Sequence, residues 1–387
     1  MRQRILLLTL LAGLGLTQFS CHKADGPLPE GTAVDPHSLF ARGINLSNWF
    51  NDYSDPNQFA TRFNASHFTQ IKQLGFSFVR LPIGNTVLLN PSAPSVLNPG
   101  QLALVDSAVK RITAAGLAVI IDFHPQQAGY EEALGLSKTN QDALVNFWTA
   151  LAKHYKNYPP DRLAFEIYNE PHLTGVAPTQ FQDDWWLPVQ GRCIQAIRSV
   201  TLAHFIIAGG MEWNGLNALQ RIKPYAYDRV VYNFHFYDPF IFTHQGADWT
   251  GWAPAQQAHD VPYPSSPEAV ASLVASAGTQ ELKDVLSWYG SQRYNSDTLS
   301  VWVKKASDWA TRNNVYVMCN EFGSYKLVSP PDSRIAWIHD MRTALEGHGI
   351  GWAMWEYDEG FGLVTYPAGD RNHPVVDNPT RLALGLN

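Results

Sequence analysis

The sequence of 387 residues contains very little cysteine. Cys21, Cys193 and Cys319 are its three cysteines, and their spacing matches no structural zinc site. Cys193 falls in a helical pattern and Cys319 in a strand pattern, so these two side chains need not meet. Without a disulfide network, stability must come from the hydrophobic core, and a hydrophobic content of 45% allows a full one.

Positive charge and several catalytic motifs are also missing. The formal net charge is -6, which gives no basic field to attract a phosphate backbone, so nucleic acid is not expected as a partner. The motifs His-Glu-x-x-His and Gly-x-Ser-x-Gly do not occur, nor does an EF-hand loop. We therefore expect no zinc protease, no serine hydrolase of that type, and neither a metal nor another cofactor.

A long apolar run occurs at one place, the N-terminus. Two arginines precede an apolar run over residues 5–16, which is shorter than the ~20 residues of a membrane-spanning helix and is typical of an export signal. We expect residues 1–21 to be a signal peptide. Cys21 stands where a bacterial lipoprotein carries its lipidated cysteine, although Gln18 replaces the usual Leu, so cleavage without lipidation is the alternative. The protein is expected to be exported: secreted, periplasmic, or held at the bacterial cell surface through a lipid on Cys21.

Eight short apolar runs alternate with helical patterns along the rest of the chain. The strand candidates cover residues 41–49, 76–82, 117–124, 163–171, 204–210, 230–237, 315–323 and 350–357. The helical patterns cover residues 64–74, 102–115, 142–155, 180–200, 300–312 and 333–347. The strand candidates are rich in β-branched and aromatic residues, as is typical of strands buried on both faces, and the alternation favours a parallel sheet.

The parallel sheet has two possible forms. An open doubly wound sheet would place a Gly-rich phosphate loop after the first strand, whereas this chain has Asn-Leu-Ser-Asn-Trp there. We therefore predict the α/β class and a closed (β/α)8 TIM barrel.

The barrel is expected to form a single catalytic domain. Residues 22–37 are rich in Pro, Gly, Asp and His, as is typical of a short tether, so the domain would cover residues 38–387. One connection, at about 238–298, is far longer than the others and holds Trp249 and Trp252. Long loops in compact domains are usually functional or disordered. Because this one is aromatic, we expect it to be an ordered wall of the cleft.

Two glutamates carry most of the functional information. Glu170 and Glu321 each close a hydrophobic strand, and a barrel builds its active site at the C-terminal ends of its strands. Carboxylates rarely stand beside buried strand residues without a role, and cleavage of a glycosidic bond needs two carboxyl groups that flank it. Strand alternation places Glu166 on the same face as Glu170, pointing into the barrel. There it needs Arg42 or Arg80 as an ionic partner.

The motifs at the strand ends resemble those of glycoside hydrolase family 5, the cellulase family. Residues 165–171, Phe-Glu-Ile-Tyr-Asn-Glu-Pro, are similar to the acid/base motif of that family, and residues 320–323, Asn-Glu-Phe-Gly, to its nucleophile motif. The family's other cleft positions match Arg80, His124, His235, Tyr237 and Trp355. The resemblance runs in order over residues 41–360. It implies a retaining β-glycoside hydrolase that acts on β-linked polysaccharides or oligosaccharides.

The resemblance also implies a role for each matched residue. Glu170 would be the acid/base, and Glu321 would be the nucleophile that forms a covalent glycosyl-enzyme. Arg80 and Tyr237 would keep Glu321 ionised by donating hydrogen bonds to it. Asn169 would bind the 2-hydroxyl group of the sugar.

The remaining matches and the tryptophans would build the sugar-binding surface. His124 and His235 would bind hydroxyl groups or orient their neighbours, and Trp355 would stack beneath the sugar at the cleavage point. The chain has 13 Trp, whose flat apolar faces suit sugar rings. Possible further platforms are Trp49, Trp213, Trp249 and Trp252. The tryptophans in helical patterns, which we expect in the core, are Trp148, Trp302, Trp309 and Trp337.

Two departures from the family's pattern leave the substrate open. Pro125 follows His124 directly, and residues 355–360, Trp-Glu-Tyr-Asp-Glu-Gly, hold three acidic residues. We expect a monomer that cleaves a β-1,4-glucan as an endo-β-1,4-glucanase does; mannan, xyloglucan, β-1,3-glucan and small β-glucosides are alternatives. A catalytically idle carbohydrate-binding protein is the alternative of another class. The presence of both glutamates together with Arg80 and Tyr237 argues against it.

Overall fold

The computed structural model describes residues 34–51, 57–90, 96–172 and 185–387. The predicted signal peptide, with Cys21, and most of the predicted tether lie outside these residues, so those predictions rest on the sequence alone. The last residues of the predicted tether enter a short helix, α1 (Pro36–Leu39), which Asp35 caps. In the described part of the chain, no helix is both long and apolar enough to cross a bilayer.

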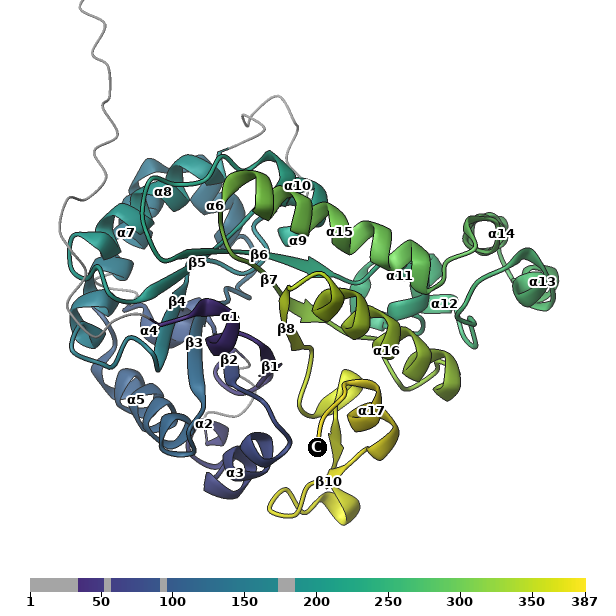
Figure 1. Ribbon diagram of the computed structural model, residues 1–387, viewed down its shortest axis with the longest axis horizontal. Coiled ribbons are helices and arrows are strands. Elements are labelled where there is room, and N and C mark those ends of the chain that lie inside the picture. Colours follow the sequence, from purple (N-terminus) through teal and green to yellow (C-terminus); the bar gives the residue numbers. More distant parts are fainter. Residues whose placement is uncertain (1–33, 52–56, 91–95, 173–184) are drawn as a thin grey trace, which may run out of the picture.

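The central feature is a closed barrel of eight parallel strands that neighbour one another in chain order (Figure 1). The strands are β1 (Arg42–Asn45), β2 (Phe78–Ile83), β3 (Ala118–Phe123), β4 (Leu163–Glu166), β5 (Phe205–Gly209), β6 (Val230–Phe236), β7 (Val317–Phe322) and β8 (Gly351–Met354). All eight predicted strands are present, and the predicted (β/α)8 barrel is confirmed. Several predicted segments were too long, because the chain leaves the sheet before their polar last residues; β4, for example, ends at Glu166 rather than residue 171.

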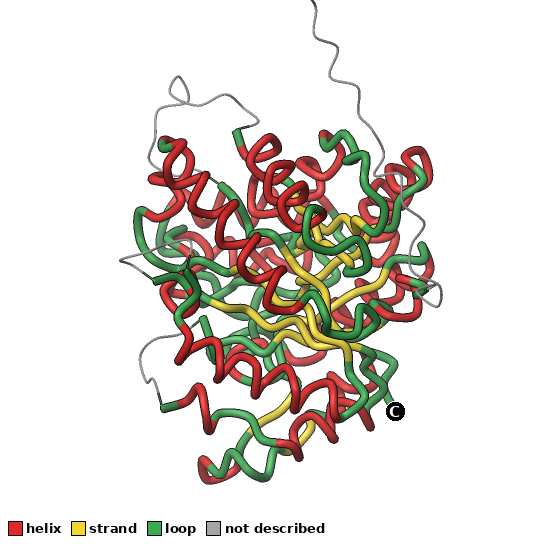
Figure 2. The backbone as a smooth tube through the Cα atoms, turned by 90° about the vertical axis from the view of Figure 1, so that its left-hand side faces the viewer, coloured by secondary structure: helices red, strands yellow, loops and turns green. Residues whose placement is uncertain are grey.

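Helices surround the strands (Figure 2). The longer helices around the barrel are α3 (Ala65–Gln73), α5 (Pro99–Ala114), α7 (Lys138–Tyr155), α8 (Trp186–Arg198), α15 (Ser296–Asn313) and α16 (Pro331–Gly347). Each overlaps a predicted helical pattern, although the predicted start of α8 at residue 180 lies outside the described residues. Local signals set the helix starts. Asn98, for example, caps α5 by accepting hydrogen bonds from the N–H groups of Gly100 and Gln101.

Shorter elements complete the described chain. The short helices are α2 (Gln58–Thr61), α4 (Asn85–Leu88), α6 (Tyr130–Leu136), α9 (Met211–Asn214), α10 (Leu216–Arg221), α11 (Phe240–Thr243), α12 (Ala253–Gln257) and α17 (Asn378–Ala383). Turns of 3-10 helix cover Asp248–Thr250, Glu359–Phe361 and Pro367–Gly369, and the antiparallel strands β9 (Val364–Thr365) and β10 (Val375–Val376) form a small hairpin sheet beyond the barrel.

The filling of the barrel changes from apolar to polar along its axis. Phe78 of β2 and Ala164 of β4 belong to an apolar cluster inside the barrel. Two residues further along each strand, and therefore on the same face, stand Arg80 and Glu166, both buried. The apolar cluster thus closes the N-terminal end of the barrel. The C-terminal ends of the strands carry the polar groups that underlie the site.

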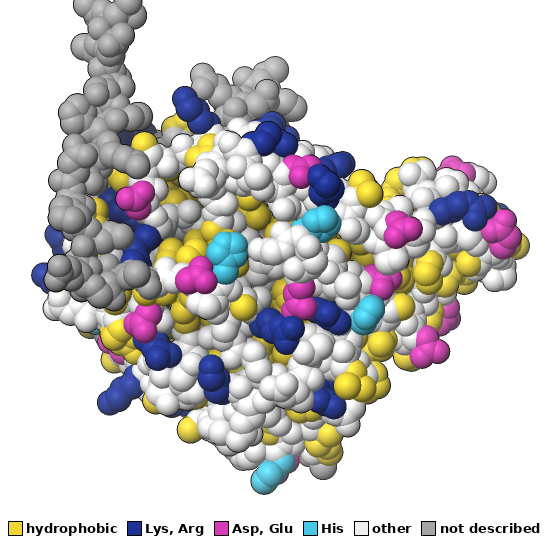
Figure 3. Space-filling model, viewed as in Figure 1, with side chains coloured by type: hydrophobic (Ala, Val, Ile, Leu, Met, Phe, Trp, Pro, Cys, Tyr) yellow, Lys and Arg dark blue, Asp and Glu magenta, His cyan; other side chains and the backbone are white. Residues whose placement is uncertain are grey.

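The long insertion divides into two parts. Its first part, with α11 and the turn Asp248–Thr250, lines the cleft. Its second part, α13 (Pro267–Ser276) and α14 (Gln280–Gln292), projects away from the barrel (Figure 1), and the projection stands out at the right of Figure 3. The prediction that the insertion walls the cleft is therefore wrong for this second part. The two helices pack against each other, and α14 also contacts α11 and α12.

Candidate active site

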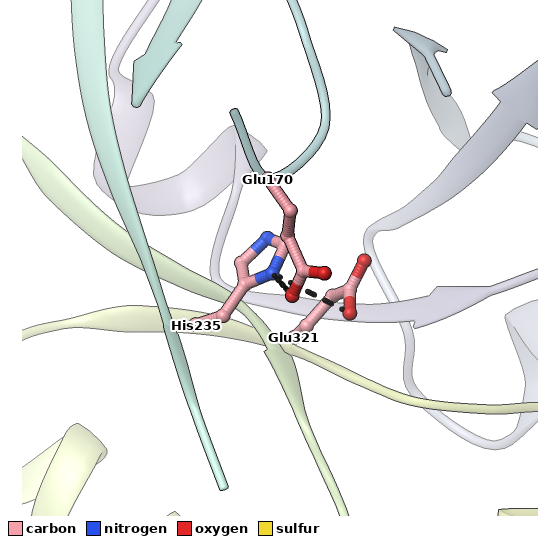
Figure 4. Close-up of side chains that lie close together, drawn as sticks. All are labelled: Glu170, His235 and Glu321. Carbon is pink, nitrogen blue, oxygen red and sulfur yellow. Dashed lines mark hydrogen bonds and ion pairs between the residues drawn. The ribbon is translucent and has the colours of Figure 1, made fainter. Parts of the chain in front are cut away.

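Two glutamates and a histidine converge at the C-terminal end of the barrel (Figure 4). Glu321 lies on β7 and His235 on β6, whereas Glu170 lies just beyond β4 in a left-handed conformation with a φ of 47°. Nδ1 of His235 lies 2.7 Å from Oε1 of Glu170 and 3.5 Å from Oε2 of Glu321. One carboxyl oxygen of each glutamate and a ring nitrogen of His235 lie within 4.8 Å of one another. The two glutamates singled out in the sequence thus face each other across a short gap.

Glu321 is held from two sides. Nη1 of Arg80 donates a hydrogen bond to its Oε1 at 2.5 Å, and the hydroxyl group of Tyr237 donates one to its Oε2 at 2.9 Å. Burial raises the pKa of Glu321, while interactions with His235 and Arg80 act in the opposite direction. These contacts fix both oxygens of the carboxyl group, and the guanidinium group supplies the positive charge that favours its ionised form.

Arg80 joins the site to the polar interior of the barrel. Its guanidinium group is fully buried and donates two hydrogen bonds to Glu166, of 2.7 Å and 2.9 Å. Nη2 also lies 2.9 Å from Oδ2 of Asp122. Of the two partners considered for Glu166, the structure therefore selects Arg80, because Arg42 pairs with Glu346 at the surface instead. Asn233 and Asn320 also donate hydrogen bonds to Glu166.

Glu170 sits in a different environment from Glu321. Its side chain is 25% exposed toward the cleft. Burial raises its pKa to about 6, against the influence of His124, Arg80 and His172. A carboxyl group with a pKa of about 6 is protonated in mildly acidic solution, as a proton donor must be. The two carboxyl groups therefore differ in their contacts: Arg80 and Tyr237 hold Glu321, whereas Glu170 pairs with His235 and is open to the cleft.

The remaining matched residues line the cleft around this pair. Nδ1 of His124 lies 2.8 Å from Oδ2 of Asp122, and its ring stacks beside that of Trp355 at 6.0 Å. Burial lowers the pKa of His124, and that of His235, to about 4, so both rings are neutral near pH 7 and suit contacts with hydroxyl groups. Oδ1 of Asn169 accepts a hydrogen bond from Arg80, which leaves its NH2 group for a ligand.

The cleft is large and lined by aromatic side chains. Its volume is about 1310 Å³, above the range of roughly 300–1,000 Å³ typical of sites for small ligands. Trp213 and Trp249, two of the suggested platforms, line it and are 50% and 56% exposed. Phe240 and Tyr325 lie on the same wall as Trp249.

The other two suggested platforms are wrong. Trp49 is fully buried; its ring packs against Phe50 and Phe63, and its Nε1 donates to the carbonyl oxygen of Phe59. The cause is a turn after β1, where Asn48 has a φ of 51° and the chain swings the indole into the core. Trp252 is half-buried behind Phe240 and packs against the main core cluster.

The tryptophans expected in the core follow their helical patterns. Trp148, Trp309 and Trp337 are buried, and Trp302 packs against the same cluster while remaining half-buried.

Some cleft residues were missed by the sequence analysis. Glu356 lines the cleft but is almost fully buried, and its Oε1 accepts a hydrogen bond from the N–H of Phe361 at 3.5 Å. Burial raises its pKa well above the usual range. The acidic run at residues 355–360 indicated an acidic group near the cleft, but it did not show which of its residues faces the cleft. Asp358 of that run is instead paired with Arg62 and Arg371.

A metal ion has one place to bind among the described residues. Glu170, His235 and Glu321 are the single group there whose ligand-type atoms lie close enough together. Arg80 contacts Glu321 at the same point, and its fixed positive charge opposes a second cation. The arrangement therefore suits proton transfer and nucleophilic attack better than metal binding.

Comparison with known families identifies the family of this chain. Residues 33–360 match the model of a family described as cellulase (glycosyl hydrolase family 5). The chain belongs to glycosyl hydrolase family 5. Members of this family hydrolyse glycosidic bonds, so the paired carboxyl groups of Glu170 and Glu321 lie in the cleft of a glycosyl hydrolase.

Similar proteins include endoglucanases. The chain is 27% identical to Endoglucanase 3 of Fibrobacter succinogenes over 336 residues, which cover 84% of this chain and 50% of that protein. It therefore spans about half the length of that relative. It is 28% identical to Endoglucanase C of Acetivibrio thermocellus over 326 residues, which cover 82% of this chain and 91% of that protein.

Solved structures superimpose on this structure over most of the chain. Cel5A of Thermotoga maritima in complex with cellobiose superimposes with a TM-score of 0.71 at 25% identity, covering 90% of this chain and 100% of that chain. Another structure, of an endoglucanase, gives a TM-score of 0.72 at 26% identity and covers 90% of this chain and 98% of that chain.

Proposed function

We propose that this family 5 protein hydrolyses internal bonds of a β-1,4-glucan with retention of configuration, using Glu170 and Glu321. The observation that carries the mechanism is the spacing of the two carboxyl groups, whose facing oxygens lie within 4.8 Å. Retaining glycosidases keep their carboxyl groups roughly 5–5.5 Å apart, whereas inverting enzymes need roughly 6.5–9.5 Å to admit a water molecule. The short gap supports direct attack by a carboxylate.

In the first step, a carboxylate oxygen of Glu321 attacks the anomeric carbon. The bond from that carbon to the glycosidic oxygen breaks, and the departing oxygen takes the proton of Glu170. The product is a glycosyl ester on Glu321. In the second step a water molecule attacks the same carbon and gives a proton to the Glu170 carboxylate, and the ester bond breaks to restore Glu321. Two inversions at one carbon give net retention.

The substrate class rests on the cleft and on the relatives. A cleft of about 1310 Å³ with exposed Trp213 and Trp249 on its walls has room for several sugar units and flat faces to stack them. Endoglucanase names among the relatives support a β-1,4-glucan. The Thermotoga enzyme has also been solved with mannotriose, which keeps mannan as the main alternative.

A reducing-sugar assay on a panel of glycans tests the substrate. The protein without residues 1–33 is incubated with carboxymethyl cellulose, mannan, xyloglucan and β-1,3-glucan. The highest rate is expected on carboxymethyl cellulose, with a fall in viscosity that precedes most of the sugar release, as internal cleavage requires. If the rate is highest on mannan, mannan is the substrate, and the proposed mechanism is unchanged. Inactivity on every glycan and on aryl β-glycosides would contradict the proposed function and favour a binding role.

The pKa of Glu170 predicts the alkaline limit of activity. The free enzyme needs Glu170 protonated, and burial raises its pKa to about 6, so kcat/KM should fall as the pH rises through about 6. The activity falls rather than rises because the protonated form of Glu170, which donates the proton, is lost as the pH increases. The profile of kcat/KM against pH on a cello-oligosaccharide measures this. A value of kcat/KM that keeps rising well above that pH would contradict the assignment of Glu170 as the acid.

We also propose that the protein is exported and acts as a monomer. The apolar run after two arginines supports export, and Cys21 is the residue through which a lipid anchor would be attached. Cell fractionation of the wild type and of Cys21→Ser tests both export and attachment, and size-exclusion chromatography with light scattering tests the monomer.

A further inference from the structure

The turn that carries Glu170 has an unfavourable backbone conformation. Glu170 has a φ of 47°, in the left-handed region that side chains other than glycine rarely occupy. Pro171 follows it, and a proline restricts the preceding residue to extended conformations. Such a conformation persists when its surroundings hold it in place. The contacts that hold this turn therefore determine where the carboxyl group of Glu170 points.

Glu131 supplies those contacts from a different part of the chain. It stands in the first turn of α6, and its Oε1 accepts a hydrogen bond from the backbone N–H of His172. Its Oε2 lies 3.1 Å from Nδ1 of the same residue. Nδ1 also lies 2.8 Å from the carbonyl oxygen of Glu170. Because both neighbours of Nδ1 are acceptors, this nitrogen carries the hydrogen, and the imidazole ring joins Glu131 to the backbone of Glu170.

The other side of the imidazole ring is also supported. The rings of His172 and Trp213 stack with their centres 4.6 Å apart and an angle of 22° between their planes. A second cavity, of about 470 Å³, adjoins the main cleft here and is lined by Glu131, Glu170, His172 and Trp213 among others. It extends the cleft on the side of Glu170.

We propose that Glu131 is a positioning residue for the acid/base Glu170, acting through His172 to aim the Glu170 carboxyl group at the departing oxygen. This inference rests on the proposed function. It assigns Glu131 no contact with the reacting atoms. Its loss would therefore weaken proton donation specifically, rather than substrate binding or nucleophilic attack.

The two contacts with His172 are the means by which Glu131 acts. Burial raises the pKa of Glu131 to about 8, and the hydrogen bond from the backbone N–H of His172 acts in the opposite direction. A glutamine keeps an oxygen that can accept from this N–H, but its NH2 group then faces the N–H at Nδ1, where Oε2 of Glu131 accepts. Glu131→Gln should therefore lose part of the function, and Glu131→Ala should lose more.

Leaving-group dependence tests the inference. The wild type, Glu131→Gln, Glu131→Ala and the control Glu132→Gln are compared on 2,4-dinitrophenyl and phenyl β-cellobioside. Departure of dinitrophenolate needs no proton, whereas departure of phenolate does. For Glu131→Ala we expect kcat/KM on the phenyl substrate to fall about 10- to 100-fold, a part of the usual contribution of a general acid. The dinitrophenyl substrate should change less than about threefold. On the phenyl substrate Glu131→Gln should lie between the wild type and Glu131→Ala, and Glu132→Gln should stay near the wild type on both substrates.

An equal loss on both substrates would overturn the proposal, because it would mean that Glu131 supports the fold or the cleft as a whole. An unchanged rate for Glu131→Ala on the phenyl substrate would overturn it as well. A crystal structure of Glu131→Ala gives a readout independent of turnover: residues 169–172 should leave the wild-type path, and an unmoved Glu170 would contradict the proposal. If the wild type cleaves no cellobioside, the proposed function fails, and this structure still decides whether Glu131 positions the turn.

Discussion

Replacement of Glu321 by alanine should lower kcat/KM on a cello-oligosaccharide roughly 10⁴-fold or more, as removal of a catalytic nucleophile does. The reason lies in the arrangement of the site. Glu321 is the carboxyl group that Arg80 and Tyr237 hold at both oxygens, and no other carboxyl group is held in this way beside Glu170 in the described structure. Glu170→Ala should cost less, about 10²- to 10⁴-fold, because it removes only the proton donor.

Addition of azide to the two variants distinguishes their roles. With 2,4-dinitrophenyl β-cellobioside, Glu321→Ala leaves space for azide to attack the anomeric carbon once, which gives the α-glycosyl azide. In Glu170→Ala the covalent ester still forms on Glu321, and azide displaces it with a second inversion, which gives the β-glycosyl azide. The configuration of each product is read by NMR. The reverse pattern would exchange the two assignments.

A remote carboxyl group provides the control for these variants. Glu281 is exposed on α14, in the projecting part of the insertion, so Glu281→Ala should retain the activity of the wild type. Hydrolysis by Glu321→Ala at a substantial fraction of the wild-type rate, without azide, would contradict the double displacement itself.

The sequence predicts those features that follow from periodicity. The eight strands were recognisable as short apolar runs, and in a barrel their polar last residues must meet at one end. This is why Glu170 and Glu321 could be paired although they lie far apart in the chain. The two-residue period of a strand likewise placed Glu166 inside the barrel, where it required an ionic partner. The sequence left Arg42 and Arg80 as candidates, and the structure selects Arg80.

Features that depend on irregular backbone could not be predicted. Trp49 was expected in the cleft because it follows β1, but the left-handed Asn48 turns it into the core. No pattern of apolar residues encodes that turn. The contacts between Glu131 and His172 join the first turn of α6 to the segment beyond β4, and no periodic pattern in the sequence brings these two segments together.

The insertion shows a different limit of the sequence. Amphipathic helices such as α13 and α14 bury an apolar face, but the sequence does not show which part of the protein covers that face. Packing on the barrel and packing on each other satisfy the same pattern. In the structure α13 and α14 pack on each other, α14 also contacts α11 and α12, and Val270 and Leu286 are buried.

Arg80→Met should destabilise the fold by about 3–5 kcal/mol at neutral pH, the usual cost of leaving buried charges without their partner. The guanidinium group contacts Asp122, Glu166 and Glu321. Burial raises the pKa of each of these carboxyl groups, and Arg80 acts to lower it. Arg80→Lys should recover little, because a single ammonium group cannot reproduce the planar fork that reaches three carboxylates.

The pH dependence of this loss provides the decisive check. Without Arg80, the pKa values of the three carboxyl groups in the folded state rise further above those in the unfolded state. The penalty should therefore be complete above the raised folded pKa values and should shrink as the pH falls toward the unfolded values near 4. Urea unfolding of the wild type and the variant, followed by tryptophan fluorescence at several pH values, measures the difference. The double variant Arg80→Met/Glu166→Gln should lose less than the sum of its single variants, because one uncompensated charge is removed. A penalty that grows on acidification would mean that Arg80 stabilises the barrel by packing rather than by its charge.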